Sequence, residues 1–541
     1  MAYPNANSVI SCDVLVVGGG NAGFCSAISA AQSGARNVLL IDKCPSGWAG
    51  GNSHFTAGAF RTVHSGLKDI LPLVNNVGSE IASTIDLDPY TREDFLGDLS
   101  RMTTGRFEPE LGQTLIDESN ETVKWLAGNG VRFQLSFNRQ AYKIDGRFKF
   151  WGGMCLKTEE GGKGLIVDHQ RAAKRAGVTV LYSTAAKQII LDPKTRGFKS
   201  LLAEDCNGKS LLINAQAVVL AAGGFESNPR MRSQYLGPGW DLAHVRGTPY
   251  NTGECLEMAI RDISAKQAGQ WSGCHSVAWD ANAPANTGDR EISNEFTKSG
   301  YPLGITLNNQ GERFFDEGSD IRNYTYAKFG RAILAQPQGL AFQIWDSQGI
   351  PWLRDEEYRP EIVQRITAGT IEELAQTLAE SHGLAHPDTF VRNVRAYNDA
   401  VYAHRKENAS RGLKWDPAVK DGLSTQSSQT QLRVPKSNWA LPLDQGPFMA
   451  VRVGCGVTFT FGGLAIDPKT SAVISLTGKA IPGVFCSGEM VGGLFYENYP
   501  GGSGLTSGAV FGRKAGRSAA AVARNAGKVD VHRGAEFSPR L

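Results

Sequence analysis

The chain opens with an apolar run that leads into glycines and then into a stretch of small residues. Residues 12–43 read CDVLVVGGGNAGFCSAISAAQSGARNVLLIDK. The apolar residues 14–17 predict a buried strand, the glycines a tight turn, the small residues a helix, and VLLI a second strand. This order of strand, turn, helix and strand begins a Rossmann-like unit. We therefore expect an α/β fold in this part of the chain.

Apolar runs return at three later places. Residues 178–192 predict strands that follow a helix near 165–176, and residues 211–228 predict a buried strand that stops at two glycines. The segment IPGVFCSGEMVGG, residues 481–493, again combines a buried strand with glycines. Residues 90–130 are predicted to be mainly helical. Both halves of the chain thus carry the pattern of one α/β domain.

The middle of the chain has a different pattern. From about residue 269 the sequence contains more Asn, Asp, Trp and Pro, and its predicted helices are amphipathic. Residues 370–383 begin with a capping box, Thr370 with Glu373, and end at a glycine. Residues 388–407 predict another surface helix, and residues 408–447 are polar and rich in proline. The middle therefore reads as an insertion between two parts of one domain.

The last predicted helix is rich in small residues. It is expected to open at Ser503, and Gly508, Gly512 and Gly516 recur at every fourth position. Positions four apart share one helix face. We expect this glycine face to press against the sheet.

Composition excludes several classes of protein. The net charge of +3 is too small to indicate nucleic-acid binding, and no apolar run reaches the roughly 18 residues that span a bilayer. The nine cysteines are scattered without CxxC spacing, so no metal site is predicted. The sequence has no secretory pattern at its start, which favours a cytoplasmic protein; the final SPRL offers a weak peroxisomal alternative.

The glycine turn carries the strongest chemical signal. Gly18, Gly20 and Gly23 form GxGxxG between a strand and a helix, and Asn21 and Ala22 start that helix. A helix that opens at glycines can receive a pyrophosphate at its N-terminus. Asp42, with Lys43 after it, follows the second strand about 20 residues further on, where an acid binds a ribose hydroxyl. The pattern predicts a dinucleotide site but does not separate NAD from FAD.

The next segment, GWAGGNSHFTAG, places Gly50, Gly51, Asn52 and Ser53 soon after that acid. It resembles the GGN-[ST] block of the fumarate reductase/succinate dehydrogenase flavoprotein family, which lies along FAD. Within that family the chain looks most like tricarballylate dehydrogenase-type flavoproteins, and 3-ketosteroid dehydrogenases are more distant relatives. The resemblance implies FAD as the cofactor.

The resemblance also implies the fold. It predicts a Rossmann-like FAD-binding domain of glutathione reductase type, formed by residues 1–268 and 459–541. An α+β capping domain with the substrate site is expected at residues 269–458. Further FAD contacts are implied at these positions: Ala186, Ala222, Gly223, Gly224, Gly488, Glu489, Ser503, Gly504 and Leu505.

Flavin chemistry next to a carbonyl group also needs a proton donor or base. In GERFFDEGSDIRNYTYAKFGR, Arg322 follows Glu317 in a block similar to that of fumarate reductases, which place a catalytic arginine there. The same region offers Tyr324 as a phenolic acid or base. Glu295 and Lys298 resemble the relay acid and base of that family. The alternative is a structural Arg322 paired with a nearby aspartate.

Three further positions bear on the substrate. His275 stands where the reductases place a substrate-binding histidine, although a lone histidine is more often structural. Phe459 replaces a family histidine, and Tyr499 before Pro500 replaces a carboxylate-binding arginine. Tyrosine, proline and glycine at this place resemble the ketosteroid dehydrogenases, where a phenol holds a carbonyl oxygen. The substrate is therefore expected to be less anionic than fumarate.

The sequence thus predicts a flavin-dependent oxidoreductase that forms or reduces a C=C bond next to a carbonyl or carboxyl group of a small molecule. Noncovalent FAD is favoured, with attachment through His54 as the alternative. No second strand–GxGxxG–helix unit follows, so a separate electron donor or acceptor is expected. A ketosteroid-type dehydrogenase and a redox-neutral flavin isomerase remain alternatives, and the substrate and direction stay open.

Overall fold

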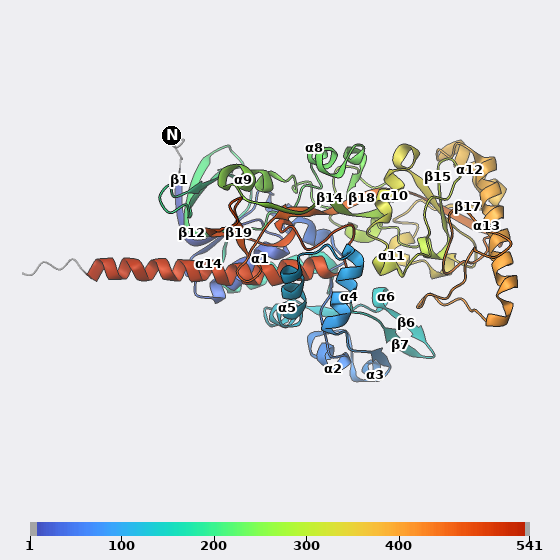
Figure 1. Ribbon diagram of the computed structural model, residues 1–541, viewed down its shortest axis with the longest axis horizontal. Coiled ribbons are helices and arrows are strands. Elements are labelled where there is room, and N and C mark those ends of the chain that lie inside the picture. Colours follow the sequence, from blue (N-terminus) through green and yellow to red (C-terminus); the bar gives the residue numbers. More distant parts are fainter. Residues whose placement is uncertain (1–7, 536–541) are drawn as a thin grey trace, which may run out of the picture. The chain divides into compact units, whose positions relative to one another are not determined.

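The computed structural model describes residues 8–535 (Figure 1), so the terminal SPRL lies outside the described residues. The chain forms two compact units. The first comprises the residues up to Leu236, Gly247–Cys274 and the residues from Phe459 onward. The second comprises Gly237–Arg246 and His275–Thr458. The second unit therefore includes a short segment that the sequence pattern assigned to the first domain.

The first unit is built on a mixed sheet. Its strands are β1 (Ser8–Val17), β2 (Val38–Ile41), β9 (Thr179–Leu181), β10 (Thr184–Leu191), β11 (Phe198–Asp205), β12 (Ser210–Leu220), β19 (Ala472–Ile474) and β20 (Ala480–Cys486). β1 pairs in parallel with β12 on one side and with β2 on the other, and β2 pairs in parallel with β9. The predicted α/β fold with a parallel core is confirmed.

Strand β12 joins the two sequence-distant parts of this sheet. Its first half pairs antiparallel with β11, where Ser200 lies opposite Asn214. Its second half pairs in parallel with β20, where Val218 lies opposite Val484. The apolar end of β12 is therefore buried between strands from the two ends of the chain.

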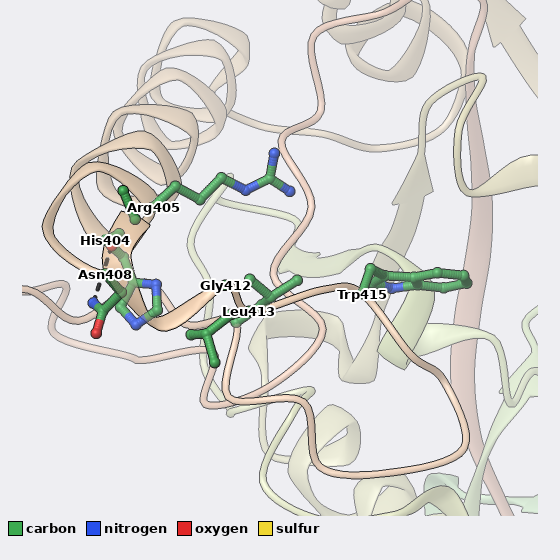
Figure 2. Close-up of a pocket in the computed structure, with 8 residues that line it drawn as sticks. His404, Arg405, Asn408, Gly412, Leu413 and Trp415 are labelled. Atoms are coloured by element: carbon green, nitrogen blue, oxygen red, sulfur yellow. Dashed lines mark hydrogen bonds between the residues drawn. The ribbon is translucent and has the colours of Figure 1, made fainter.

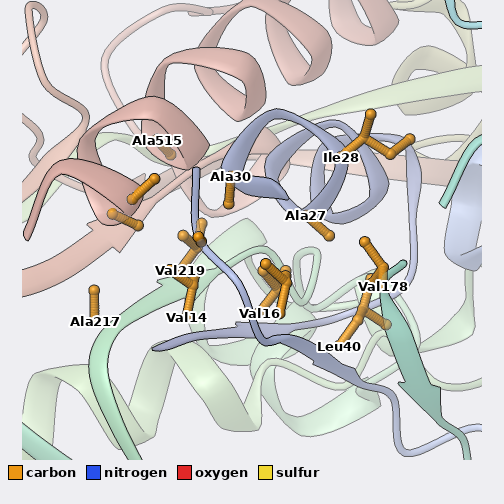
Figure 3. Close-up of a cluster of buried hydrophobic side chains, with 14 of the residues drawn as sticks. Val14, Val16, Ala27, Ile28, Ala30, Leu40, Val178, Ala217, Val219 and Ala515 are labelled. Carbon is orange, nitrogen blue, oxygen red and sulfur yellow. The ribbon is translucent and has the colours of Figure 1, made fainter. Parts of the chain in front are cut away.

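The sheet core is made of small and β-branched side chains (Figure 3). Val14 and Val16 of β1 are fully buried and pack with Ala27 and Ala30 of α1 (Asn21–Gln32). Small alanines let the helix lie close to the strands, so it covers the sheet with little side-chain volume between them. Ala515 of the last helix belongs to the same cluster.

The last helix, α14 (Ser503–Ala535), opens at Ser503 as expected, but its glycine face packs differently from the prediction. A Cβ atom on Gly512 would lie 2.6 Å from the backbone oxygen of Ala22, and one on Gly516 would lie 2.2 Å from that of Ser26. These glycines press against α1, not against the sheet. Helices interlock through such bare positions because their backbones can then approach closely.

Shorter elements complete the first unit. Its other helices are α2 (Leu67–Ile70), α3 (Ser79–Ala82), α4 (Arg92–Thr103), α5 (Pro109–Gly128), α6 (Phe137–Gln140), α7 (Gly161–Arg175), α8 (Pro229–Met231) and α9 (Glu254–Ile263). Its small sheets contain β3 (Ala59–Phe60), β5 (Phe133–Leu135) and β8 (Leu156–Thr158), and β4 (Ile85–Leu87), β6 (Ala141–Ile144) and β7 (Arg147–Phe150). The helical prediction for residues 90–130 is confirmed by α4 and α5.

The second unit has its own sheet, in which β16 lies between β15 and β18. The strands are β13 (His244–Val245), β14 (Gln267–Asp280), β15 (Ile305–Asn308), β16 (Ala341–Trp345), β17 (Ile366–Ala368) and β18 (Phe448–Leu464). β14 and β18 run across the division, and only their residues from His275 and up to Thr458 belong to this unit.

Helices of the second unit are α10 (Phe329–Leu334), α11 (Asp355–Tyr358), α12 (Ile371–Ser381) and α13 (Pro387–Glu407). The capping box predicted for α12 is present, with the Glu373 amide donating to the Thr370 hydroxyl. Leu374 of α12 and Phe390 of α13 are fully buried in a cluster with the strands β15 and β16. The two predicted surface helices therefore cover one sheet face.

We predict that Gly516→Ala destabilises the first unit. The new methyl group would overlap the Ser26 carbonyl, and overpacking of this kind costs about 1–3 kcal/mol of unfolding free energy. Gly97→Ala is the matched control, because Gly97 lies exposed in the middle of α4 with open space around it. Ala is the better helix former, so this control should stabilise by about 0.5–1 kcal/mol. Thermal unfolding would measure both, and equal melting temperatures would contradict the proposed packing.

Candidate functional site

The glycine turn after β1 is held by two close backbone approaches. Gly18 has a φ of +106°, and a Cβ atom there would lie 2.4 Å from the Ala221 carbonyl oxygen. A Cβ atom on Gly23 would lie 1.8 Å from the Gly18 carbonyl oxygen. Only glycine fits either position. α1 then begins after Gly20, which supplies no side chain to cap the first amides of the helix.

Two polar side chains from later in the sequence reach this turn. Asp42 follows β2, and its Oδ2 accepts a hydrogen bond of 2.7 Å from the amide of Gly19. Ser53 Oγ accepts one of 3.0 Å from the amide of Asn21. The structure therefore brings the predicted acid and the GGNS segment to the start of α1.

The GGNS segment lies against the turn with bare backbone on both sides. A Cβ atom on Gly51 would lie 3.8 Å from the Gly20 Cα, and one on Gly20 would lie 3.7 Å from the Gly50 carbonyl oxygen. Asn52 is held within the protein, because its Nδ2 donates to Glu226 and its Oδ1 accepts from the amide of Thr248 at 2.9 Å. This side chain positions the segment through contacts with protein groups.

The segment Ala222-Gly223-Gly224 follows β12 and meets the GEM turn, residues 488–490. A Cβ atom on Gly224 would lie 2.1 Å from Oε1 of Glu489, and one on Gly488 would lie 2.6 Å from Cβ of Ala22. Thr460 donates to Glu489 Oε1 from its amide, at 2.7 Å, and from its hydroxyl, at 3.0 Å. The carboxylate of Glu489 is therefore oriented by a fixed partner.

The start of α14 joins the same region. Asn21 Nδ2 donates to the backbone oxygen of Leu505 at 2.8 Å, and a Cβ atom on Gly508 would lie 3.0 Å from that same nitrogen. The Ser503 hydroxyl donates to the Pro500 carbonyl. The N-termini of α1 and α14 thus meet, although Ser503, Gly504 and Leu505 are almost 500 residues from the glycine turn.

These groups fit FAD. Backbone amides at a glycine-lined helix start suit a pyrophosphate, and an aspartate beside them suits a ribose. The start of α14 presents amides and a positive dipole end, which suit an electron-rich ring system. Residues predicted from widely separated motifs lie in one unit and touch one another, which a chance GxGxxG sequence would not explain.

Three other positions that the sequence predicts at the FAD site contact protein groups. The ammonium group of Lys43 bonds to Thr252 Oγ1 at 2.7 Å and to Glu254. Ala186 is buried on β10 opposite Ala203. The ring of His54 is 8% exposed and packs edge-on against Phe55.

Two acids, Glu226 and Glu489, lie side by side near the GEM turn. The sequence pattern predicted Glu489 but not Glu226. Glu226 directly follows the Gly223-Gly224-Phe225 turn and is completely buried, whereas Glu489 is half-buried. Among the described residues, Glu226 Oε2 has no donor in bonding geometry, and the Glu489 carboxyl lies beside it. Two neighbouring carboxylates repel each other when both are ionised, so this arrangement favours a protonated form of the pair. An acid directly after a predicted strand end was the available signal.

The pKa values of this pair are raised. Burial raises the pKa of Glu489 to about 7, although hydrogen bonds from Thr460 oppose the shift. Burial and the charge of Glu489 together raise the pKa of Glu226 well above its usual range. The two acids therefore titrate as a pair.

Tyr499 lies in an aromatic cluster near the start of α14. Its ring centroid is 5.3 Å from that of Phe459 and 5.6 Å from that of Phe495, both edge-on, and Phe461 completes the group. A Cβ atom on Gly504 would lie 3.8 Å from both the Tyr499 and Phe459 rings. Phe459 and Tyr499, which stand where the resembling reductases have histidine and arginine, thus belong to one aromatic cluster.

Predicted catalytic residues of the second unit occupy two places. His275 on β14 is 2% exposed, and its ring packs edge-on against Tyr326 at 5.2 Å. Burial and the charge of Arg246 lower the pKa of His275 well below its usual range, so it is neutral. Arg246 itself is buried, stacks over Trp279 and donates to Thr458 Oγ1 at 2.8 Å. Sequence reasoning missed Arg246, because nothing marks an arginine at the end of a two-residue strand.

Arg322 begins a one-turn helix, Arg322–Tyr324, and is half-buried. Its Nη1 donates to Ser299 Oγ at 3.4 Å. Tyr324 follows in the same turn and is also half-buried. The nearby aspartates have other partners as well, since Asp320 pairs with Lys420 at 3.0 Å and Asp316 accepts from Ser437.

A pocket of about 340 Å³ lies elsewhere in the second unit, at the C-terminal end of α13 (Figure 2). His404, Arg405 and Asn408 of that helix and Trp415 of the following loop line it. None of its lining residues belongs to the motifs singled out in the sequence. This pocket is therefore not assigned to the flavin chemistry.

The comparisons with known proteins agree with this geometry. Residues 13–505 match the family described as FAD binding domain, so the chain belongs to that family. It is 28% identical over 511 residues to the "Probable fumarate reductase Ifc3" of Shewanella frigidimarina, covering 94% of this chain and 74% of that protein. It is 26% identical over 544 residues to a vinyl phenol reductase of Lactiplantibacillus plantarum, covering 94% and 96%.

Among solved structures, the open conformation of a flavocytochrome c3 fumarate reductase has a TM-score of 0.69 to this chain. The two are 25% identical, and the match covers 96% of this chain and 79% of the other. The fold, the family and the fitted site together define a flavin-dependent oxidoreductase that acts on C–C and C=C bonds and uses FAD.

Two further findings concern the described residues 8–535. Within them, no helix combines the length and apolar character that crossing a membrane requires. His, Cys, Asp and Glu side chains of this part of the chain form no group of three that could hold a metal ion.

We predict that Glu226→Gln reduces the pH dependence of stability. Acids whose pKa is raised on folding stabilise the protein below their unfolded pKa, near 4.3, and lose this contribution as pH rises through the folded value. Wild type should therefore lose stability between about pH 5 and pH 8 as the pair ionises. In the variant, the amide still accepts from Asn52 and can donate to Glu489, so this loss should shrink.

Melting temperatures of FAD-saturated protein across that pH range would measure the effect. Glu372→Gln is the control, because Glu372 is 50% exposed and pairs only with Arg395 across the surface of the second unit. The control should follow the wild-type curve. Parallel curves for Glu226→Gln and wild type would contradict the raised pKa values of the pair.

Proposed function

We propose that this protein interconverts a single and a double C–C bond next to a carbonyl or carboxyl group of a small molecule that also carries an apolar or ring portion. The aromatic cluster of Phe459, Phe461, Phe495 and Tyr499 carries this proposal. Phe459 and Tyr499 stand where the resembling dicarboxylate reductases have histidine and arginine. Aromatic side chains bind rings better than they bind a second carboxylate.

The similar proteins support this substrate class. One of them is named a fumarate reductase and another a vinyl phenol reductase, so a carboxylate and an aromatic ring both occur among their substrates. Their shared feature is a C=C bond conjugated with an electron-withdrawing or aromatic group. A small unsaturated acid or ketone with a ring fits both names and the aromatic cluster.

FAD, when bound, supplies hydride transfer at its isoalloxazine ring. The residues of the chain supply the remaining functions. Arg322 gives or takes the proton at the second carbon, and the phenol of Tyr499 holds the oxygen on which charge develops. His275, neutral and buried, accepts or donates one hydrogen bond to the substrate. Electrons enter or leave through a separate carrier, since the sequence has no second dinucleotide motif.

A ketosteroid-type dehydrogenase acting on a bulky cyclic ketone is the second candidate. The sequence Tyr499-Pro500-Gly501 favours it, because a phenol next to a backbone amide suits a ketone oxygen. The two candidates differ in the size of the substrate.

We predict that anaerobically photoreduced enzyme is reoxidised by at least one conjugated compound from a panel of fumarate, urocanate, 4-vinylphenol, cyclohex-2-enone and 4-androstene-3,17-dione. The reason is that a reduced flavin returns hydride to a C=C bond polarised by a conjugated group. The flavin absorbance near 450 nm would follow the reaction. Oxidised enzyme mixed with saturated counterparts tests the opposite direction. Isomerisation of a panel member without any change of flavin absorbance would contradict the proposal.

We predict that Tyr499→Phe retains FAD but lowers kcat/KM by about 10²-fold, because one donor to the developing oxyanion is lost. The ring stays in its aromatic cluster, so folding should be unaffected. Tyr402→Phe is the control, since Tyr402 is 48% exposed and bonds only to Asp444 on the surface. Steady-state rates with the best panel member would measure both. An unchanged kcat/KM for Tyr499→Phe would exclude the oxygen-holding role.

A further inference from the structure

A hydrogen-bonded chain in the second unit leads from Arg322 to the surface. The guanidinium Nη1 of Arg322 donates to Ser299 Oγ at 3.4 Å, and Ser299 Oγ donates to Glu357 Oε2 at 2.5 Å. The amide of Ser299 donates to the same carboxylate oxygen at 3.0 Å. One serine therefore bridges the proposed proton donor and a second acid.

Glu357 is the buried centre of this chain. Its side chain is 1% exposed, whereas that of Arg354, which bonds to Glu357 Oε1 at 3.4 Å, is 17% exposed. Both residues lie at the start of α11, one turn apart. A buried carboxylate with a partly exposed arginine on one side and a serine on the other provides a path along which a proton can move between water and Arg322.

The acid suggested by the family resemblance has other contacts. Glu295 is 32% exposed and forms an ion pair with Arg359. Lys298 Nζ is completely buried and donates to the backbone oxygen of Glu295 at 2.9 Å, so it does not bond to the Glu295 carboxylate through this contact. In this chain the acid linked through Ser299 to Arg322 is Glu357, which no sequence motif marked.

We propose that Glu357 and Ser299 carry protons between solvent and Arg322, and that Glu357 replaces Glu295 as the relay acid. This inference rests on the proposed role of Arg322. In the reducing direction, Arg322 gives one proton to the substrate carbon and becomes neutral. The Glu357 carboxylate takes up a proton from water beside Arg354 and passes it to the Ser299 oxygen, while the Ser299 hydroxyl gives its own proton to Arg322. One solvent proton is consumed per turnover, and no electrons move along the chain.

Several charged or titratable groups surround the relay. They are Lys298, Tyr301, Arg322, Arg354 and Tyr358. Burial lowers the pKa of Lys298 to about 8, although Asp280 and Glu357 oppose the shift. Burial raises the pKa values of Tyr301 and Tyr358, so both phenols stay protonated near neutral pH. Of these neighbours, Lys298 is the one with a pKa near neutral pH. The pH dependence of turnover in each variant is therefore compared with that of wild type.

The relay makes a specific kinetic prediction. Arg322 already carries the proton needed for a first turnover, so only later turnovers need the relay. In Glu357→Gln, reoxidation of the reduced flavin by a panel substrate in a single turnover should stay within about threefold of wild type. Steady-state turnover with dithionite-reduced methyl viologen as electron donor should fall about 10²-fold or more, since proton transfer contributes 10²–10⁴-fold. Its solvent deuterium isotope effect should rise above that of wild type.

Glu295→Gln is the matched control and should show wild-type steady-state rates, and Ser299→Ala should behave as Glu357→Gln does. A role of Glu357 in structure alone would slow the first turnover as much as the later ones, and this result would overturn the relay. Unchanged steady-state turnover in Glu357→Gln, or an equal loss in Glu295→Gln, would also overturn it. If no panel member reoxidises the wild-type flavin, the proposed function fails, and the relay fails with it.

Discussion

The close approach of α1 and α14 determines the arrangement of the first unit. Both helices begin at the glycine-rich turns, and their bare faces meet, with Gly512 against Ala22 and Gly516 against Ser26. Side chains at these points would overlap the backbone of α1. The contact sets the position of both N-termini relative to β1 and β12, and these N-termini carry the amides that suit FAD.

Much of this could be read from the sequence. The alternation of apolar runs and glycines gave the strands β1, β2, β12 and β20, because buried parallel strands and tight turns leave distinct local patterns. The predicted FAD-contact residues Gly18–Gly23, Asp42, Gly50–Ser53 and Ser503–Leu505 come together in one unit. These positions were predictable because each motif meets a local requirement for bare backbone or for one particular donor or acceptor.

The remaining features depend on long-range contacts that local patterns do not encode. The glycine face of α14 was recognised, but its partner was misjudged, because a helix face does not reveal whether a helix or a sheet covers it. Glu226 and Glu357 are acids whose burial depends on residues from distant segments, Glu489 for the first and Ser299 for the second. Neither composition nor motif spacing distinguishes these two glutamates from glutamates on the surface. The same holds for Arg246, whose burial comes from Trp279 and Asn294.

The order in which the chain is made has a consequence for how the protein matures. Asn21 bonds to Leu505, and Ser29 bonds to the backbone of Arg513, so partners 484 positions apart complete the site. During synthesis, α1 and β1 leave the ribosome long before α14 exists, and their small-residue surface has no covering helix. Such distant contacts form slowly, because a long loop must close first. The groups that fit FAD therefore come together only after the chain has been made as far as α14.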